Sequence, residues 1–143
     1  MPQNQTQIDL TGQYSVRAAK PDDYKFIVST FLKGLYYGDS WFSQIDKDAF
    51  MDNYKKVIDG FFRSPQAAIQ VACLREDEDT IIGYSITSSD YSKIHWVFVK
   101  AAWRRHGIAR RLCPQYPETV THLNALGKTL LPKVNNPKFN PFF

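Results

Sequence analysis

The stretch that decides the fold is Val97-Phe98-Val99-Lys100-Ala101-Ala102-Trp103-Arg104-Arg105-His106-Gly107-Ile108-Ala109-Arg110-Arg111-Leu112. The segment 93–99 is rich in β-branched and aromatic residues, which is typical of a buried strand. Apolar residues return at helical spacing after Gly107. The sequence therefore predicts a strand, a basic turn and a helix in direct succession.

The turn after this strand has the features of an anion-binding site. The first N–H groups of a helix have no partner inside the helix and carry partial positive charge. Gly107 and the small Ala109 leave room for a diphosphate to approach the backbone. Arg104, Arg105 and Arg110 add full positive charges around the same point. The alternative interpretation is an ordinary strand–helix turn with a solvated arginine cluster.

Composition sets the limits within which this turn is interpreted. The chain has 143 residues and 15% aromatic residues, so we expect a single domain, over 14–143, whose core relies on Phe, Tyr and Trp. A net charge of +4 suits an acidic partner such as a phosphorylated cofactor. Two cysteines without paired spacing fit the reducing cytoplasm, and no run is long and apolar enough for a membrane. Residues 1–13 are polar and are predicted to form a flexible leader.

The apolar patterning predicts an α+β domain with the order β-α-α-β-β-β-α-β, in which helices flank a mixed, mostly antiparallel sheet with a shortened C-terminal part. Strands are predicted at 14–17, 67–74, 81–87, 93–99 and 119–123. Helices are predicted at 21–38, 46–63, 108–113 and 124–131. Strict alternation in the fourth strand would put Ile94, Trp96 and Phe98 on one face and His95, Val97 and Val99 on the other. Phe139, Phe142 and Phe143 in the tail 135–143 are expected to pack against the domain.

Arg104, Gly107 and Ala109 resemble the signature Arg/Gln-x-x-Gly-x-Gly/Ala of the GCN5-related N-acetyltransferase (GNAT) family. The segment 14–23 and the element order look like this family too, and the chain is similar to short acetyltransferase-like proteins encoded by tailed phages. In the family the turn holds the pyrophosphate of coenzyme A, so the resemblance implies acetyl-CoA as the cofactor. It assigns cofactor binding to Phe98, Val99, Arg104, Arg105, His106, Gly107, Ile108, Ala109, Arg110 and Asn124.

The resemblance implies an acetyl-CoA-dependent N-acetyltransferase, an acyltransferase that moves an acetyl group to a primary amine of a small molecule or a protein. His95 is the candidate catalytic base, because the pKa of a histidine can be tuned near neutrality; the alternative is a histidine packed in the sheet. His122 is expected on the fifth strand, near the thiol. Substrate binding is assigned to the loop that lines the acceptor pocket in the family, through Tyr36, Tyr37, Trp41 and Phe42.

Other functions stay open at this point. Leu131 stands where the family usually has the tyrosine that protonates the departing thiolate, which favours, as an alternative, a weak or inactive GNAT-fold protein that binds a partner, such as a host protein. Nucleic-acid binding by the arginine cluster is the least supported function, because the cluster stands alone next to a glycine turn. The histidines and cysteines have no metal-ligand spacing, so no metal is predicted. The many aromatic residues leave room for a homodimer.

Overall fold

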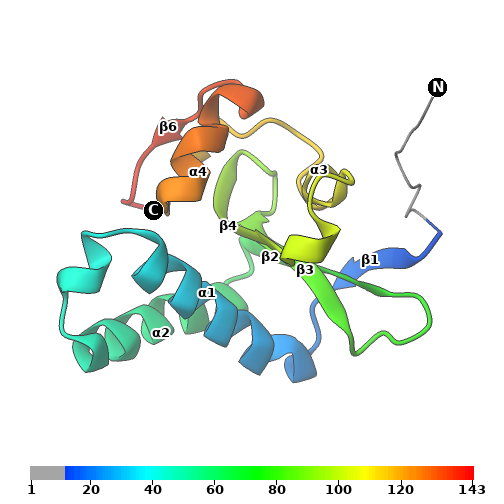
Figure 1. Ribbon diagram of the computed structural model, residues 1–143, viewed down its shortest axis with the longest axis horizontal. Coiled ribbons are helices and arrows are strands. Elements are labelled where there is room, and N and C mark those ends of the chain that lie inside the picture. The colour runs from blue at the N-terminus through cyan, green and yellow to red at the C-terminus, as the bar shows by residue number, and fades with distance from the viewer. Residues whose placement is uncertain (1–11) are drawn as a thin grey trace.

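The computed structural model describes residues 12–143 and contains a mixed sheet of six strands in the order β1-β2-β3-β4-β5-β6 (Figure 1). The first four strands form an antiparallel meander, and β5 and β6 each add in parallel to the strand before. The expected α+β class is confirmed. Most of the leader predicted over 1–13 lies outside the described residues. The strands are β1 (Tyr14–Ala18), β2 (Ala67–Leu74), β3 (Ile81–Ser88), β4 (Lys93–Val99), β5 (Thr119–Val120) and β6 (Lys138–Phe139).

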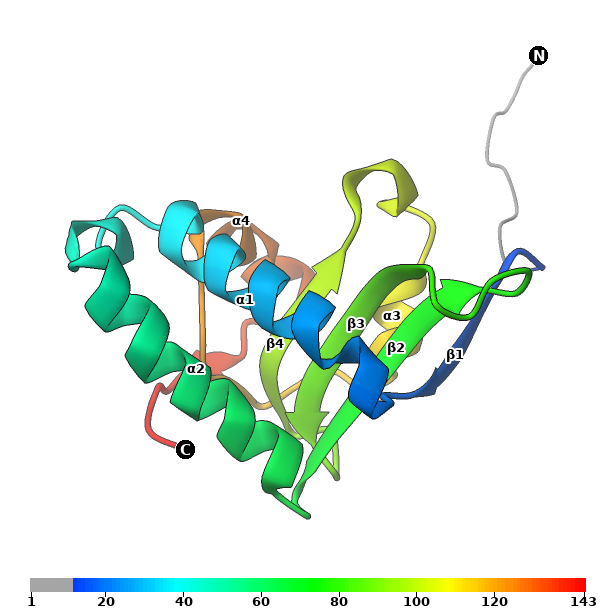
Figure 2. The same cartoon turned by 90° about the horizontal axis from the view of Figure 1, so that it is seen from below.

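Helices cover both faces of the sheet, as Figures 1 and 2 show. α1 (Tyr24–Gly38) and α2 (Lys47–Arg63) pack on one face, and the short α3 (Ile108–Leu112) packs on the other. α4 (Ala125–Leu130) lies at the β4 side of the sheet. Asp46 caps α2 as predicted, since its carboxylate accepts a hydrogen bond from the Ala49 N–H at 3.0 Å. None of the described helices combines the length and apolarity that a membrane span requires.

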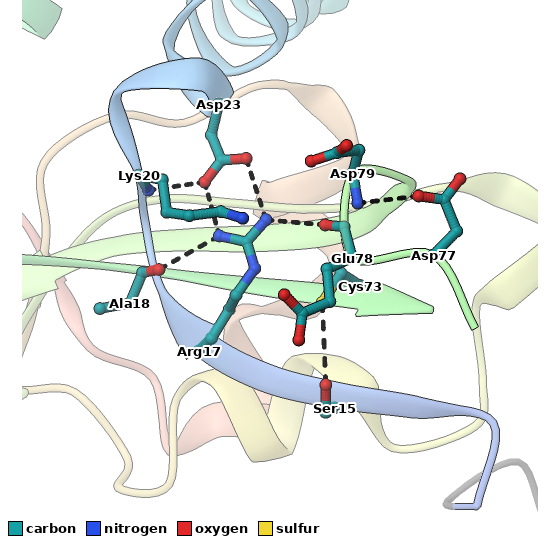
Figure 3. Close-up of polar contacts among 9 residues, drawn as sticks. All are labelled: Ser15, Arg17, Ala18, Lys20, Asp23, Cys73, Asp77, Glu78 and Asp79. Carbon is teal, nitrogen blue, oxygen red and sulfur yellow. Dashed lines mark hydrogen bonds and ion pairs between the residues drawn. The ribbon is translucent and has the colours of Figure 1, made fainter. Parts of the chain in front are cut away.

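A buried ion pair joins β1 to the entry of α1 (Figure 3). Arg17 donates two hydrogen bonds to the Asp23 carboxylate, at 2.7 and 3.0 Å, and one to the Glu78 carbonyl in the β2–β3 turn, at 2.8 Å. Asp23 also accepts from the Lys20 N–H at 2.7 Å. The guanidinium therefore connects β1 both to the nearby start of α1 and to the β2–β3 turn, which is 61 residues away in the sequence. Arg17 and Asp23 both belong to the opening segment that resembles the family.

A β-bulge interrupts β4 at His95. Thr87 of β3 pairs with Ile94, whereas the next residue back, Ile86, pairs with Trp96, so His95 is the extra residue. His95 and Trp96 consequently both face α1 and α2, while Ile94 faces α3. The predicted alternation is therefore wrong at Ile94 and His95, because the bulge inserts one residue into the two-residue period.

The C-terminal part departs most from the prediction. β5 has only two residues, and β6, which was not predicted, is held by hydrogen bonds from Lys138 N–H to Glu118 O at 3.0 Å and from Asn140 N–H to Val120 O at 2.9 Å. The Phe143 ring stacks on Phe61 of α2 with 5.3 Å between centroids, yet the Phe142 side chain is 87% exposed. The Phe139 side chain is 54% exposed as well, so the expectation that the tail packs is wrong for Phe139 and Phe142.

Candidate functional site

β4 and β5 separate after a short pairing at their first residues. The two strands pair only at Lys93–Thr119 and Ile94–Val120. The last backbone hydrogen bond between them runs from the Thr121 N–H to the Ile94 carbonyl at 3.0 Å. Within residues 12–143, no strand covers the β4 edge beyond this point. The bulge at His95 therefore marks the start of an open backbone edge.

The backbone of Val97 and Val99 lines this open edge. The Lys100 N–H donates to the Ile82 carbonyl of β3 at 2.8 Å. Backbone groups alternate sides along an antiparallel strand, so Phe98, which pairs with Tyr84, also directs its N–H and C=O at β3. Val97 and Val99, on either side of Phe98, therefore direct their N–H and C=O groups away from β3 and form the free edge. Of the two strand residues assigned to the cofactor, Val99 is on the open edge, and Phe98 faces β3.

The turn between β4 and α3 presents consecutive unpaired amides. Among the described residues, the N–H groups of residues 105–110 have no hydrogen-bond acceptor. Arg105 and Gly107 have φ angles of 67° and 79°, and such left-handed positions turn successive amides into one concavity. A Cβ at Gly107 would have nothing within 4 Å, so the space above these amides is open. The helix has only five residues, so the unpaired amides, rather than a long helix dipole, would be the groups that contact an anion here.

Arginine side chains surround this concavity. The Nε of Arg104 donates to the Val99 carbonyl at 2.9 Å, which ties the turn to the end of β4. The guanidinium of Arg110 lies 4.2 Å from the centroid of the Tyr116 ring. Arg104, Arg105 and Arg110 are exposed. Of the other residues assigned to the cofactor here, His106 is half-buried and Ala109 is exposed, while the Ile108 side chain packs in the core and offers only its amide.

His95, Thr121 and His122 form a hydrogen-bonded chain where β4 and β5 part. The Thr121 Oγ1 lies 2.8 Å from the Nδ1 of His95 and 2.8 Å from the Nδ1 of His122. His95 is only 6% exposed and stacks on Phe61 at 4.3 Å between centroids. The structure thus places His95 at the start of the open edge, in contact with the fifth-strand region.

The pKa values of both imidazoles are well below that of a free histidine. Burial, followed by the positive charge of Lys93, lowers the pKa of His95 to about 4. Burial, followed by the charge of His95, lowers the pKa of His122 to about 4 as well. Both rings are therefore neutral at pH 7, and in each the Nε2 is the nitrogen outside the contact with Thr121.

We expect the free energy of unfolding to fall as the pH drops from about 6.5 to 4. Both histidines have lower pKa values in the folded chain than in the unfolded chain, so the unfolded chain binds more protons in this interval and acid favours it. The loss is roughly 2–3 kcal/mol for each imidazole. Urea unfolding at a series of pH values measures it. His95→Gln should make the curve less steep without flattening it, because the buried His122 remains, whereas His106→Gln, outside the cluster, should leave the slope unchanged. A flat curve for the unaltered chain would contradict the burial of these rings.

A pocket of about 440 Å³ opens beside His95. Its walls come from the second half of α2, the start of β2, the end of β3, the start of β4 and the Phe143 ring. The lining residues are Lys56, Val57, Gly60, Phe61, Ser64, Gln66, Ala67, Ser88, Lys93, His95 and Phe143. Its position next to the bulge makes it a candidate entrance to the open edge.

The loop assigned to the substrate does not line this pocket. The buried Tyr36 donates its hydroxyl to the Ile45 carbonyl at 2.9 Å, which braces the loop. Phe42 packs between Phe50 and Tyr54. The side chains of Tyr37 and Trp41 are 62% and 64% exposed. The structure therefore gives Tyr36 and Phe42 packing contacts and leaves Tyr37 and Trp41 at the surface.

Both polar atoms of the Asn124 side-chain amide have hydrogen-bond partners within the fold. Its Oδ1 accepts from the Gly127 N–H at 2.7 Å, which caps α4, and its Nδ2 donates to the Gly34 carbonyl of α1 at 3.4 Å. Leu131, in the place of the family tyrosine, is half-buried at the start of a 3₁₀ turn. Asn124 thus joins α4 to α1.

Sequence reasoning missed Thr121, Lys56 and Lys93 as members of the site. Thr121 follows a two-residue strand, and its contact with His95 depends on the bulge, which has no signature in a single sequence. The two lysines are ordinary surface residues until the fold brings α2 and β4 together. One signal was available: Thr121 and His122 are adjacent polar residues inside a segment predicted to be a strand.

Comparison with known proteins gives the family. Residues 41–131 match the acetyltransferase (GNAT) domain, and no curated protein matches the sequence. Aminoglycoside N-acetyltransferase AAC(6')-Iy in complex with CoA is 11% identical, with 89% of this chain and 90% of that chain covered and a TM-score of 0.51, so the fold is shared. A possible acetyltransferase from Clostridium difficile 630 is 18% identical over 70% of this chain and 66% of its own, with a TM-score of 0.48.

A third similar structure is the glucosamine N-acetyltransferase region of a fungal multi-domain β-N-acetylglucosaminidase, with 18% identity and a TM-score of 0.45. The match covers 69% of this chain but only 11% of that protein, so this chain spans a small part of the multi-domain protein. The family match itself extends over more than half of the chain and includes the open edge of β4, the turn and α3. The chain belongs to the GNAT acetyltransferase family.

Proposed function

We propose that this chain transfers the acetyl group of acetyl-CoA to a primary amine of a small molecule or a protein. The observation that carries the proposal is the open β4 edge, which leads from the bulge at His95 to the turn of unpaired amides at residues 105–110. The residues fit the cofactor: amides and arginines suit a pyrophosphate, and a free strand edge suits a chain that contains amide groups.

Each part of this surface has a defined task. The amides of residues 105–110 donate to the phosphate oxygens, while Arg104, Arg105 and Arg110 supply positive charge. The free backbone of Val97 and the N–H of Val99 bind the pantetheine amides, since the Val99 carbonyl already accepts from Arg104. When bound, acetyl-CoA supplies an activated acetyl thioester. A backbone N–H at the parted end of the edge stabilises the negative charge that develops on the carbonyl oxygen.

His95 accepts the proton that the acceptor ammonium loses. In the tautomer in which its Nδ1–H donates to Thr121, its Nε2 lone pair is left for the acceptor. Its pKa of about 4 keeps the ring uncharged in the neutral range but makes it a weak base, so the proton passes on from His95 to water. The amine nitrogen would then bond to the acetyl carbon as the carbon–sulfur bond breaks, and the departing thiolate would take up the second proton that the nitrogen loses.

The proposal also includes the location of the protein, its relatives and its partners. Both cysteines are free and buried, which supports a location in the reducing cytoplasm. The reduced strands after β4 support the likeness to short phage-encoded acetyltransferase-like proteins. The exposed Tyr37 and Trp41 support contact with a protein acceptor or a second copy of the chain.

Incubation with acetyl-CoA and a panel of primary amines, followed by the release of free thiol, tests the function. We expect thiol release that depends on both the amine and the enzyme. His95→Gln should lower kcat by about a hundredfold or more, as expected for the loss of a general base, while coenzyme A still binds. Unchanged turnover by this variant would remove His95 from the proposal.

A second candidate function is an inactive GNAT-fold protein that contacts a partner protein. Leu131 favours it, because no tyrosine stands at that place to protonate the thiolate. The same assay separates the two: coenzyme A binding without thiol release, over the whole amine panel, would support the binding protein and contradict the enzyme.

A further inference from the structure

We infer that the pocket beside His95 receives the acceptor, and that Lys56 and Lys93 select acceptors that carry an anionic group in addition to the amine. This inference rests on the proposed acetyl transfer. The two lysines, rather than the exposed Tyr37 and Trp41, would then determine which acceptors bind.

The position of His95 connects the pocket to the open edge. His95 lines the pocket and is also the bulge residue at which β4 and β5 part. Its Nδ1 is bound to Thr121, so an amine in the pocket has the Nε2 available to it. An acceptor in this pocket is therefore next to the base and next to the end of the edge where the thioester is proposed to lie.

The charged side chains that line the pocket are all positive. Lys56 and Lys93 line it, and no aspartate or glutamate does. Among residues 12–143 the ion pairs are Arg17–Asp23 and Lys128–Asp39, so neither pocket lysine has a carboxylate partner. Asp90 lies outside the lining and accepts hydrogen bonds from Ser88 and Ser92. Two unpaired ammonium groups attract a carboxylate or phosphate and repel a polycation.

The remaining walls suit a small, flat molecule. The Phe61 ring stacks on His95 and on Phe143, with 4.3 and 5.3 Å between centroids, and the His95 and Phe143 rings are tilted by 52° at 5.0 Å. The pocket volume of about 440 Å³ is in the ordinary range for small-molecule sites. A molecule that combines an aromatic ring, an alkylamine and one negative group matches both the rings and the positive charge of the pocket.

Three probes that share one ring test this selectivity: para-(aminomethyl)benzoate, para-(aminomethyl)benzamide and para-xylylenediamine. Titration calorimetry at low salt, with saturating coenzyme A, gives their affinities, and thiol release gives kcat/KM. We expect the benzoate to bind about tenfold more tightly than the benzamide, and the diamine to bind most weakly. The preference for the benzoate should decrease as salt is added.

Variants identify the residues responsible. In Lys56→Gln/Lys93→Gln the preference for the benzoate over the benzamide should fall to about twofold or less, because both attractive charges are gone. Lys55→Gln is the matched control, since Lys55 is the neighbouring exposed lysine of α2 and does not line the pocket. Melting temperatures of both variants show whether the fold is intact.

The outcomes separate this inference from the proposed function. Equal affinity for the benzoate and the benzamide, or a preference that survives in the double variant, would overturn the inference. Acetylation of all three amines with equal efficiency would overturn it too, while supporting the proposed function. A charge-dependent preference in binding, without acetylation of any amine, would support the pocket and overturn the proposed function.

Discussion

Replacing Gly107 by valine is expected to weaken coenzyme A binding by about a hundredfold or more, because at least two phosphate hydrogen bonds would be lost. Gly107 has φ 79° and ψ 10°, a left-handed conformation that a β-branched residue adopts only with strain. The turn would change its conformation, and the amides of residues 105–110 would no longer converge on one point. The valine side chain would also occupy the open space above them.

Gly107→Asn is the matched control, since asparagine tolerates left-handed backbone and should keep the amides in place. Its affinity for coenzyme A should lie within about tenfold of that of the unaltered chain. Titration calorimetry measures both affinities, and circular dichroism checks the fold. Undiminished binding by the valine variant would show that the pyrophosphate lies elsewhere.

Replacing Asp23 by alanine is expected to lower the free energy of unfolding by about 3 kcal/mol, the typical cost of removing one partner from a buried ion pair. The change leaves the Arg17 guanidinium with only the Ala18 and Glu78 carbonyls as partners, and it removes the acceptor of the Lys20 N–H. The attachment of β1 to the start of α1 and to the β2–β3 turn would loosen together (Figure 3).

Urea unfolding measures this loss, and Asp22→Ala is its control. Asp22 is exposed and adjacent, and its replacement should change stability by about 0.5 kcal/mol or less. Burial tends to raise the pKa of Asp23, but the hydrogen bonds from Arg17 and Lys20 outweigh it and lower the pKa below its usual value. The stabilisation is therefore present above the ordinary carboxyl pKa and is lost as the pH falls through the folded pKa. An equal loss in the two variants would contradict the role of the ion pair.

The sequence predicts the first two thirds of the fold well, because those elements have strong periodic patterns and clear end signals. β2 and β4 have the predicted bounds, and α1 lies within the predicted helix 21–38 and buries an apolar stripe that includes Ile27, Phe31 and Leu35. The bulge at His95 was beyond prediction, since it depends on how β3 and β4 pair rather than on local preference. β6 was missed for a similar reason: its two residues have no pattern and pair only because β5 offers a free edge.

The candidate site also has one part that is continuous in the sequence and one part that only the fold assembles. The turn at residues 104–109 is continuous in the sequence, so its glycine and arginines predict an anion site there, and the family resemblance implies that the anion is the pyrophosphate of coenzyme A. The acceptor side is assembled from α2, β2, β3, β4 and the tail, and only the fold brings Lys56, Lys93 and Phe143 together. The aromatic residues of the α1–α2 loop drew attention because they are conspicuous in the sequence, but two of them have packing partners instead.

The Thr121 hydroxyl has a single hydrogen to share between two ring nitrogens. Thr121 has no other hydrogen-bond acceptor among the residues described, so that hydrogen goes to the Nδ1 of one histidine, and the other histidine donates its own Nδ1–H to the oxygen. His95 and His122 must therefore adopt opposite tautomers. A proton can therefore be taken up only at the Nε2 of the ring that donates its Nδ1–H, and transfer through the Thr121 hydroxyl exchanges the two tautomers. The pair titrates as one unit rather than as two independent groups.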